Sequence, residues 1–157
     1  QKTRSLAECL AVFGIDEAHL QHHRKGEPTP NEIALVRKEA SQTLPMGIGM
    51  LAVAFVLLLI DSELIRSIGL GVGMLGIALV GIAVNMFQST ITMVKGGIHR
   101  TQKQTAQYQA FLVECNHKQY QVHPDVWHRL WDDDEGVYRV YLLANKVVSI
   151  EPDDILN

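Results

Sequence analysis

Residues 44–60 read LPMGIGMLAVAFVLLLI, and after Asp61-Ser62-Glu63 a second apolar run extends from residue 64 to residue 87. Between residues 44 and 94 the only charged side chains are Asp61, Glu63 and Arg66, all at or near the break. A helix of about 20 apolar residues crosses a hydrocarbon core of about 30 Å. A buried hairpin of a soluble bundle is the alternative, but soluble helices carry a polar stripe and neither run has one. The segment 44–94 therefore predicts a transmembrane helical hairpin, with spans at about 44–60 and 64–87 and a turn at 61–63. Pro45 is expected in the first turn of the first span, where its missing N–H has no cost.

The distribution of Lys and Arg predicts the orientation of this hairpin. Six basic residues precede the first span, and Lys95, Arg100 and Lys103 follow the second, whereas the turn region holds only Arg66. Because cytoplasmic loops carry the excess of Lys and Arg, we expect both termini on the cytoplasmic side of a bacterial plasma membrane. The chain begins with Gln1, so we also expect residues before it. Cys9 and Cys115 form no C-x-x-C and are predicted to be reduced thiols.

Small residues mark the second run as a helix-packing element. Small residues allow helix backbones to approach closely in lipid, where packing replaces the hydrophobic driving force. One interpretation is packing against the first span, and the other is packing against a helix of another subunit. The predicted helix-packing interface consists of Gly69, Gly73, Gly76, Gly81 and Asn85.

Residues 1–43 are predicted to form short helices at the cytoplasmic or interfacial side. Ser5 and Asp16 are capping residues for helices over 6–13 and 17–25, which Gly14 and Gly26 end. Pro30 begins a third helix, expected over residues 31–42. Such short helices do not fold alone, so we expect them to lie on the membrane, on the C-terminal domain or on a partner.

A histidine cluster is the weak metal candidate of this sequence. His19, His22 and His23 share one flank of the second helix because they are spaced i, i+3 and i+4. A solvated polar face is the favoured interpretation, because three histidines without a Cys or a paired carboxylate are a poor metal signature. We therefore predict no metal and no cofactor.

Residues 95–157 are predicted to form a small cytoplasmic β domain. Expected strands at 92–100, 107–115 and 119–122 are followed by a short helix at 123–131 and by strands at 137–143 and 147–151. The first of these strands is expected to be broken at Gly96-Gly97. Asn116-His117-Lys118 is expected to be a hairpin turn, and 132–136 an acidic, solvated turn. The fold class is then an α+β membrane protein, whose C-terminal part is a five-stranded β-barrel of OB-like or SH3-like type. In broad layout the chain resembles small membrane-anchored bacterial proteins with a helical hairpin and a compact β-barrel, such as the NfeD-like proteins. No residue roles follow from that likeness.

Enzyme signatures are missing from the sequence. It has no Walker loop, no H-E-x-x-H and no nucleophile elbow. Seven basic and nine acidic residues in 95–157 argue against nucleic acid as a partner. We predict a non-catalytic accessory or assembly subunit, whose partners are other membrane protein subunits and the lipid bilayer. The alternatives are a self-associating membrane scaffold or small transport protein and, third, a metal-dependent membrane enzyme.

Overall fold

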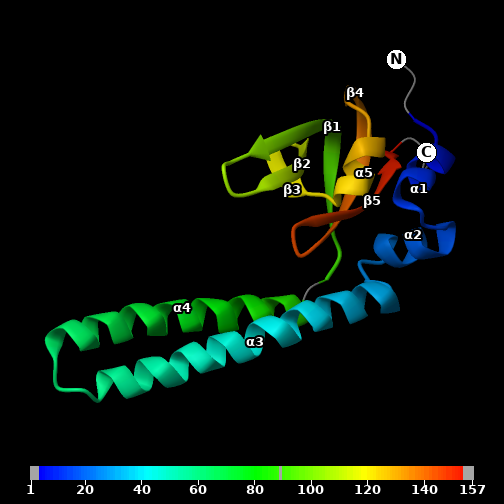
Figure 1. Ribbon diagram of the computed structural model, residues 1–157. Helices are drawn as coiled ribbons and strands as arrows, with labels where there is room; N and C mark the ends of the chain where they lie inside the picture. Colours follow the sequence, from blue (N-terminus) through cyan, green and yellow to red (C-terminus); the bar gives the residue numbers. More distant parts are fainter. Residues whose placement is uncertain (1–3, 89, 154–157) are drawn as a thin grey trace. The chain divides into compact units, whose positions relative to one another are not determined.

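The computed structural model describes residues 4–88 and 90–153, which form two compact units (Figure 1). The helical unit begins at residue 30 and contains α3 (Pro30–Leu58) and α4 (Glu63–Phe87). The sheet unit combines the residues up to 29 with those from 90 onward. Its helices and strands are α1 (Leu6–Phe13), α2 (Glu17–Arg24), β1 (Thr92–Gln104), β2 (Gln109–Cys115), β3 (Lys118–Gln121), α5 (Pro124–Arg129), β4 (Asp133–Leu143) and β5 (Lys146–Pro152).

The helical unit is a hairpin of two antiparallel helices that lie side by side (Figure 1). Both helices are long and apolar enough to cross a membrane, and most of their apolar surface is exposed. Gly47 and Gly76 are buried where the helices meet. A Cβ on Gly76 would lie 3.0 Å from the Gly47 carbonyl oxygen, so the two backbones approach as closely as glycine allows.

The helix α3 differs from the prediction because it is continuous. We expected one helix to end near Gln42 and a second to begin with Pro45 in its first turn, but Pro45 lies inside the helix. A proline inside a helix removes one backbone hydrogen bond and need not end the helix when nearby groups compensate. In the turn before Pro45 the Ser41 hydroxyl donates to the Lys38 carbonyl at 2.8 Å and the Thr43 hydroxyl to the Glu39 carbonyl at 3.1 Å, so neither replaces the bond that Pro45 removes from the Ser41 carbonyl.

The first two helices begin and end as their sequence predicts. Ser5 and Glu8 form a complete capping box at the start of α1, and Gly14 ends it in the left-handed conformation with φ 62°. Asp16 accepts a hydrogen bond from the His19 amide and caps α2. Of the three expected locations, the structure places α1 on the sheet, because α1 packs against β5.

All five strands form one sheet, in the predicted order of three strands, a helix and two strands. The pairing follows β1-β2-β3-β5-β4 and closes on itself, since β1 pairs with both β2 and β4. The link between β3 and β5 is the weakest, a parallel contact of Gln121 with Lys146. Tight turns at Asn116-His117 and Ala144-Asn145 have positive φ, as two-residue hairpin turns require.

Two expected interruptions of the strands are wrong. First, β1 runs through Gly96 and Gly97 with a bulge instead of breaking there. Gly97 lies so close to β4 that a Cβ would be 2.9 Å from the Asp134 carbonyl oxygen. Second, β4 begins at Asp133, inside the stretch predicted to be a solvated acidic turn.

The core of the sheet unit is formed mostly by the strands and by the segment around α5. Its buried members outside residues 4–29 are Ile98, Val113, Cys115, Val122, Leu130, Tyr138, Val140, Leu142, Val147 and Ile150. From residues 4–29 only Cys9 belongs to this buried cluster, with Val12 and Phe13 packed against it. The sheet therefore supplies most of its own apolar core.

Candidate functional site

The predicted helix-packing residues fall on two different faces of the hairpin. Gly69, Gly73 and Gly76 face α3: added Cβ atoms there would lie 3.1 Å from the Leu57 Cβ, 3.4 Å from the Ala54 Cβ and 3.0 Å from the Gly47 oxygen, respectively. An added Cβ on Gly81 would meet nothing within 4 Å. Asn85 is exposed. The glycines around Gly73 thus pack within the hairpin, and Gly81 does not.

The outward side of the hairpin carries small residues as well as large ones. Gly49 and Gly71 have no atom within 4 Å of an added Cβ, which is the same environment as Gly81. Around them the large apolar side chains are exposed: Leu64 and Met74 are each 73% exposed. This surface can accept another helix or lipid.

The histidine cluster is not brought together as a metal site. His23 is buried, and its Nδ1 lies 2.6 Å from the Ser149 hydroxyl on β5. His19 and His22 remain partly exposed beside the carboxylates of Asp16 and Glu27. Within residues 4–88 and 90–153, no group of three or more His, Cys, Asp and Glu side chains could hold a metal ion.

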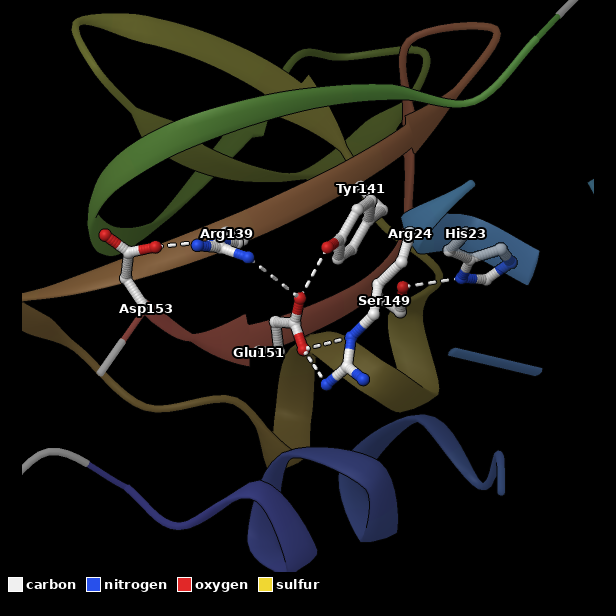
Figure 2. A network of polar contacts seen from close by, with 7 residues as sticks. All are labelled: His23, Arg24, Arg139, Tyr141, Ser149, Glu151 and Asp153. Atoms are coloured by element: carbon white, nitrogen blue, oxygen red, sulfur yellow. Dashed lines mark hydrogen bonds and ion pairs between the residues drawn. The ribbon is translucent and has the colours of Figure 1, made fainter. Parts of the chain in front are cut away.

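Next to His23 lies the most buried charged group of the described chain, Glu151 on β5. It is 1% exposed and accepts two hydrogen bonds from Arg24 of α2, at 3.0 Å from Nε and 2.6 Å from Nη2 (Figure 2). Its other oxygen accepts a hydrogen bond from the Tyr141 hydroxyl and lies 3.9 Å from Arg139 Nη1. A buried carboxylate is tolerated only when it is paired in this way.

The charge network continues along the same strands. Arg139 donates from Nε to Asp153 at 2.5 Å (Figure 2). Lys95 Nζ lies 3.4 Å from the same carboxylate oxygen. These cations lower the pKa of Asp153, with the hydrogen bond from Arg139 as the largest cause. Reciprocally, the hydrogen bond to Glu151 raises the pKa of Arg24. Burial and the hydrogen bond to Glu151 raise the pKa of Tyr141.

The network around Glu151 joins α2 to β4 and β5 and offers no accessible nucleophile. Ser149 beside His23 has the residue types of a hydrolytic pair, but Ser149 is 0% and His23 only 2% exposed, so no substrate reaches them. Sequence reasoning missed this network because Arg24 and Glu151 are 127 positions apart. The available local signal was that Leu20 and His23, spaced i and i+3 on α2, share the face that is buried.

The acidic stretch 132–135 contains a structural carboxylate. Asp133 is buried and accepts hydrogen bonds from the Gly136 amide at 2.8 Å and from the Tyr138 hydroxyl at 2.6 Å. The Tyr138 hydroxyl in turn accepts from the Arg4 amide at 3.1 Å. The hydrogen bond from Tyr138 is the main cause that lowers the pKa of Asp133. Asp133 therefore organises the start of β4.

A shallow polar hollow of about 340 Å³ lies at the β1 bulge. It combines two histidines and two carboxylates with the turn after β2, but these side chains form no metal-holding group of three within the described ranges. Its lining consists of Gly96, Gly97, His99, Glu114, Asn116, His117 and Asp134.

No family model matches the chain, and no curated protein or solved structure shows a significant similarity to it.

Proposed function

We propose that this chain is a small non-catalytic accessory or assembly subunit of a larger membrane protein complex. The hairpin α3–α4 anchors it in the bilayer, and the sheet unit is the part that it presents to other subunits. The observation that carries the proposal is the division of the hairpin into a small-residue seam and an exposed apolar outer surface. An outer surface of this extent calls for a cover of lipid or of partner helices.

The sheet unit supports a hairpin that crosses the membrane twice. Residues before and after the hairpin pack into one core, and the Ile91 amide donates to the Gly26 carbonyl at 3.2 Å. Two segments that share one core lie on one side of a bilayer. Because both segments carry the excess of Lys and Arg, we propose that this side is the cytoplasm of a bacterial cell.

For the sheet unit we propose a small barrel of the OB type rather than the SH3-like type. The closed pairing order and the position of α5 between β3 and β4 support it. Seven basic against nine acidic residues in 95–157 favour protein partners over nucleic acid.

Extraction in a mild detergent, followed by sizing and mass spectrometry, tests the accessory-subunit function. We expect the chain to elute with other membrane proteins at a size well above its own 17.5 kDa plus the micelle. Elution as a bare monomer from the same membranes would contradict the proposal.

Self-association is the second candidate, and the open glycines on the outer surface favour it. Gly49, Gly71 and Gly81 leave room for a second copy of the hairpin. Cross-linking of the purified chain separates the two functions: discrete homo-oligomer bands support a scaffold, and their absence supports an accessory subunit.

A further inference from the structure

Residues 4–25, which we term the strap, cover one side of the sheet unit. They consist of α1, α2 and their flanking turns, and they contact the strands through a small number of groups. On α1 these are Cys9, Val12 and Phe13, with the Arg4 guanidinium 5.6 Å from the centroid of the Trp131 ring. On α2 they are Leu20, His23 and Arg24.

The attachment of α2 is mainly polar. Leu20 is the one apolar residue of α2 that is fully buried, and the specific contacts to β5 are His23 with Ser149 and Arg24 with Glu151. An eight-residue helix is not stable without tertiary contacts. The docked state of α2 therefore depends on a few bonds, and the ion pair to the buried Glu151 is the strongest of them.

Two glycines in the left-handed region flank α2. Gly14 has φ 62° and Gly26 has φ 76°. The carbonyl of Gly26 is held by the Ile91 amide, so the chain beyond Gly26 remains tied to the start of the strands when α2 moves. Gly26, which follows the end of the strap, is suited to absorb the backbone rotation of a hinge, whereas Gly14 lies within the strap between α1 and α2.

We infer that the strap opens and closes as a unit over a sheet that stays folded, with the Arg24–Glu151 pair as its latch. Most of the apolar core remains intact in the open form, since among the described residues the strap supplies only Cys9 to the central buried cluster and has Leu20 as its other fully buried apolar side chain. Opening uncovers Ser149 and Glu151 on β5. The strap thereby switches a polar surface between a covered and an accessible state, which is a conformational device beyond the role of an anchor.

The two cysteines of the chain report on this motion without any added label site. Cys9 is 0% exposed and lies in the strap, whereas Cys115 is 1% exposed and lies in β2. Burial raises the pKa of the Cys9 thiol to about 12, so in the closed form it is both covered and protonated. A thiol reagent attacks the thiolate, and Cys9 reacts only after the strap has opened.

The experiment follows maleimide labelling of the full chain in detergent, with each cysteine quantified by peptide mass spectrometry. We expect Cys9 to be labelled at least about tenfold faster than Cys115, because local opening requires less free energy than global unfolding. The substitution Arg24→Gln should accelerate labelling of Cys9 by a further tenfold or more and leave Cys115 unchanged. Leu20→Ala removes the buried apolar contact of α2 and should also accelerate the labelling of Cys9.

A matched control is Arg66→Gln, which removes an exposed ion pair with Asp61 in the hairpin turn and should change neither rate. Equal labelling rates of Cys9 and Cys115 in the wild type and in both strap variants would overturn the inference, because the strap and the sheet would then unfold together. Complete protection of Cys9 in all of them would overturn it as well.

Discussion

The Arg24 guanidinium and the Glu151 carboxylate meet at 2.6 Å, although 127 positions and the whole helical hairpin separate them in the chain. Glu151 is 1% exposed on its side chain and Arg24 is 18% exposed. The pair therefore lies at the boundary between the core and the solvent, where a charge-assisted hydrogen bond is stronger than on an open surface.

Glu151→Gln should lower the free energy of unfolding by about 2–3 kcal/mol. Breaking a fully buried pair costs about 3–5 kcal/mol, and the cost is smaller here because both arginine partners keep some access to water. Chemical denaturation of the full chain in detergent, followed by tryptophan fluorescence, measures this change. Asp61→Asn, which removes the fully exposed partner of Arg66, should leave the midpoint unchanged. Equal midpoints for wild type and Glu151→Gln would show that the buried pair contributes no net stability.

Tyr138→Phe should destabilise the sheet unit in a pH-dependent manner. The hydroxyl donates to Asp133 and holds the pKa of that carboxyl below its ordinary value of 3.8. A depressed pKa contributes stability above the unfolded pKa, and this contribution is lost as the pH falls through the folded value. The difference between wild type and Tyr138→Phe should thus be about 1 kcal/mol or more at pH 7 and shrink below about pH 4. Thermal unfolding at several pH values measures it, and a constant difference would assign the effect to packing alone.

Gly76→Leu and Gly71→Leu should have different effects on the helical unit. At Gly76 a Cβ already meets the Gly47 oxygen at 3.0 Å, so a leucine forces α3 and α4 apart and costs about 1–3 kcal/mol or more. At Gly71 a Cβ meets nothing within 4 Å, so the hairpin tolerates the leucine. Accumulation of the protein in the membrane should fall for Gly76→Leu, whereas for Gly71→Leu only the recovery of partners should fall. Unchanged partner recovery for Gly71→Leu would indicate that this face contacts lipid.

Ser62→Cys should react with an impermeant thiol reagent added to intact cells. Ser62 precedes α4 in the turn of the hairpin, and in the proposed topology this turn lies across the membrane from the sheet unit. The native thiols Cys9 and Cys115 are poor reporters of orientation, because both are buried and their labelling is limited by opening of the sheet unit on either side of the membrane. Lys103→Cys, at an exposed position of β1, is the better control and should react only after the cells are permeabilised. The reverse pattern would invert the proposed orientation.

Local patterns predicted the elements of this chain and not their long-range contacts. Ser5, Gly14 and Asp16 act within one helical turn, so their capping roles could be recognised from the sequence. Pro45 was misjudged because a proline is compatible both with the start of a helix and with the interior of a long apolar one. The stretch 132–136 was wrongly predicted to be solvated because four consecutive acidic residues are typical of an exposed turn. The burial of Asp133 depends on its hydrogen bond with Tyr138, five positions later in the chain.

The candidate site could not be predicted from the sequence for a different reason. The spacing of Gly69, Gly73 and Gly76 places them on one side of α4, where added Cβ atoms would lie within 3.4 Å of atoms of α3. The network around Glu151 brings together α2, β4 and β5, and no periodicity within any one of them indicates the other two.

The bond between the Ile91 amide and the Gly26 carbonyl has a consequence for biogenesis. The sheet unit is discontinuous: its first segment is synthesised before the hairpin and its second segment after it. If only one helix of the proposed anchor entered the bilayer, the two segments of the sheet unit would lie on opposite sides of the membrane. Cys9 could then not pack against the strands. Only chains with both helices inserted could then fold the sheet unit, and mis-inserted chains would expose their unfolded apolar residues to proteases.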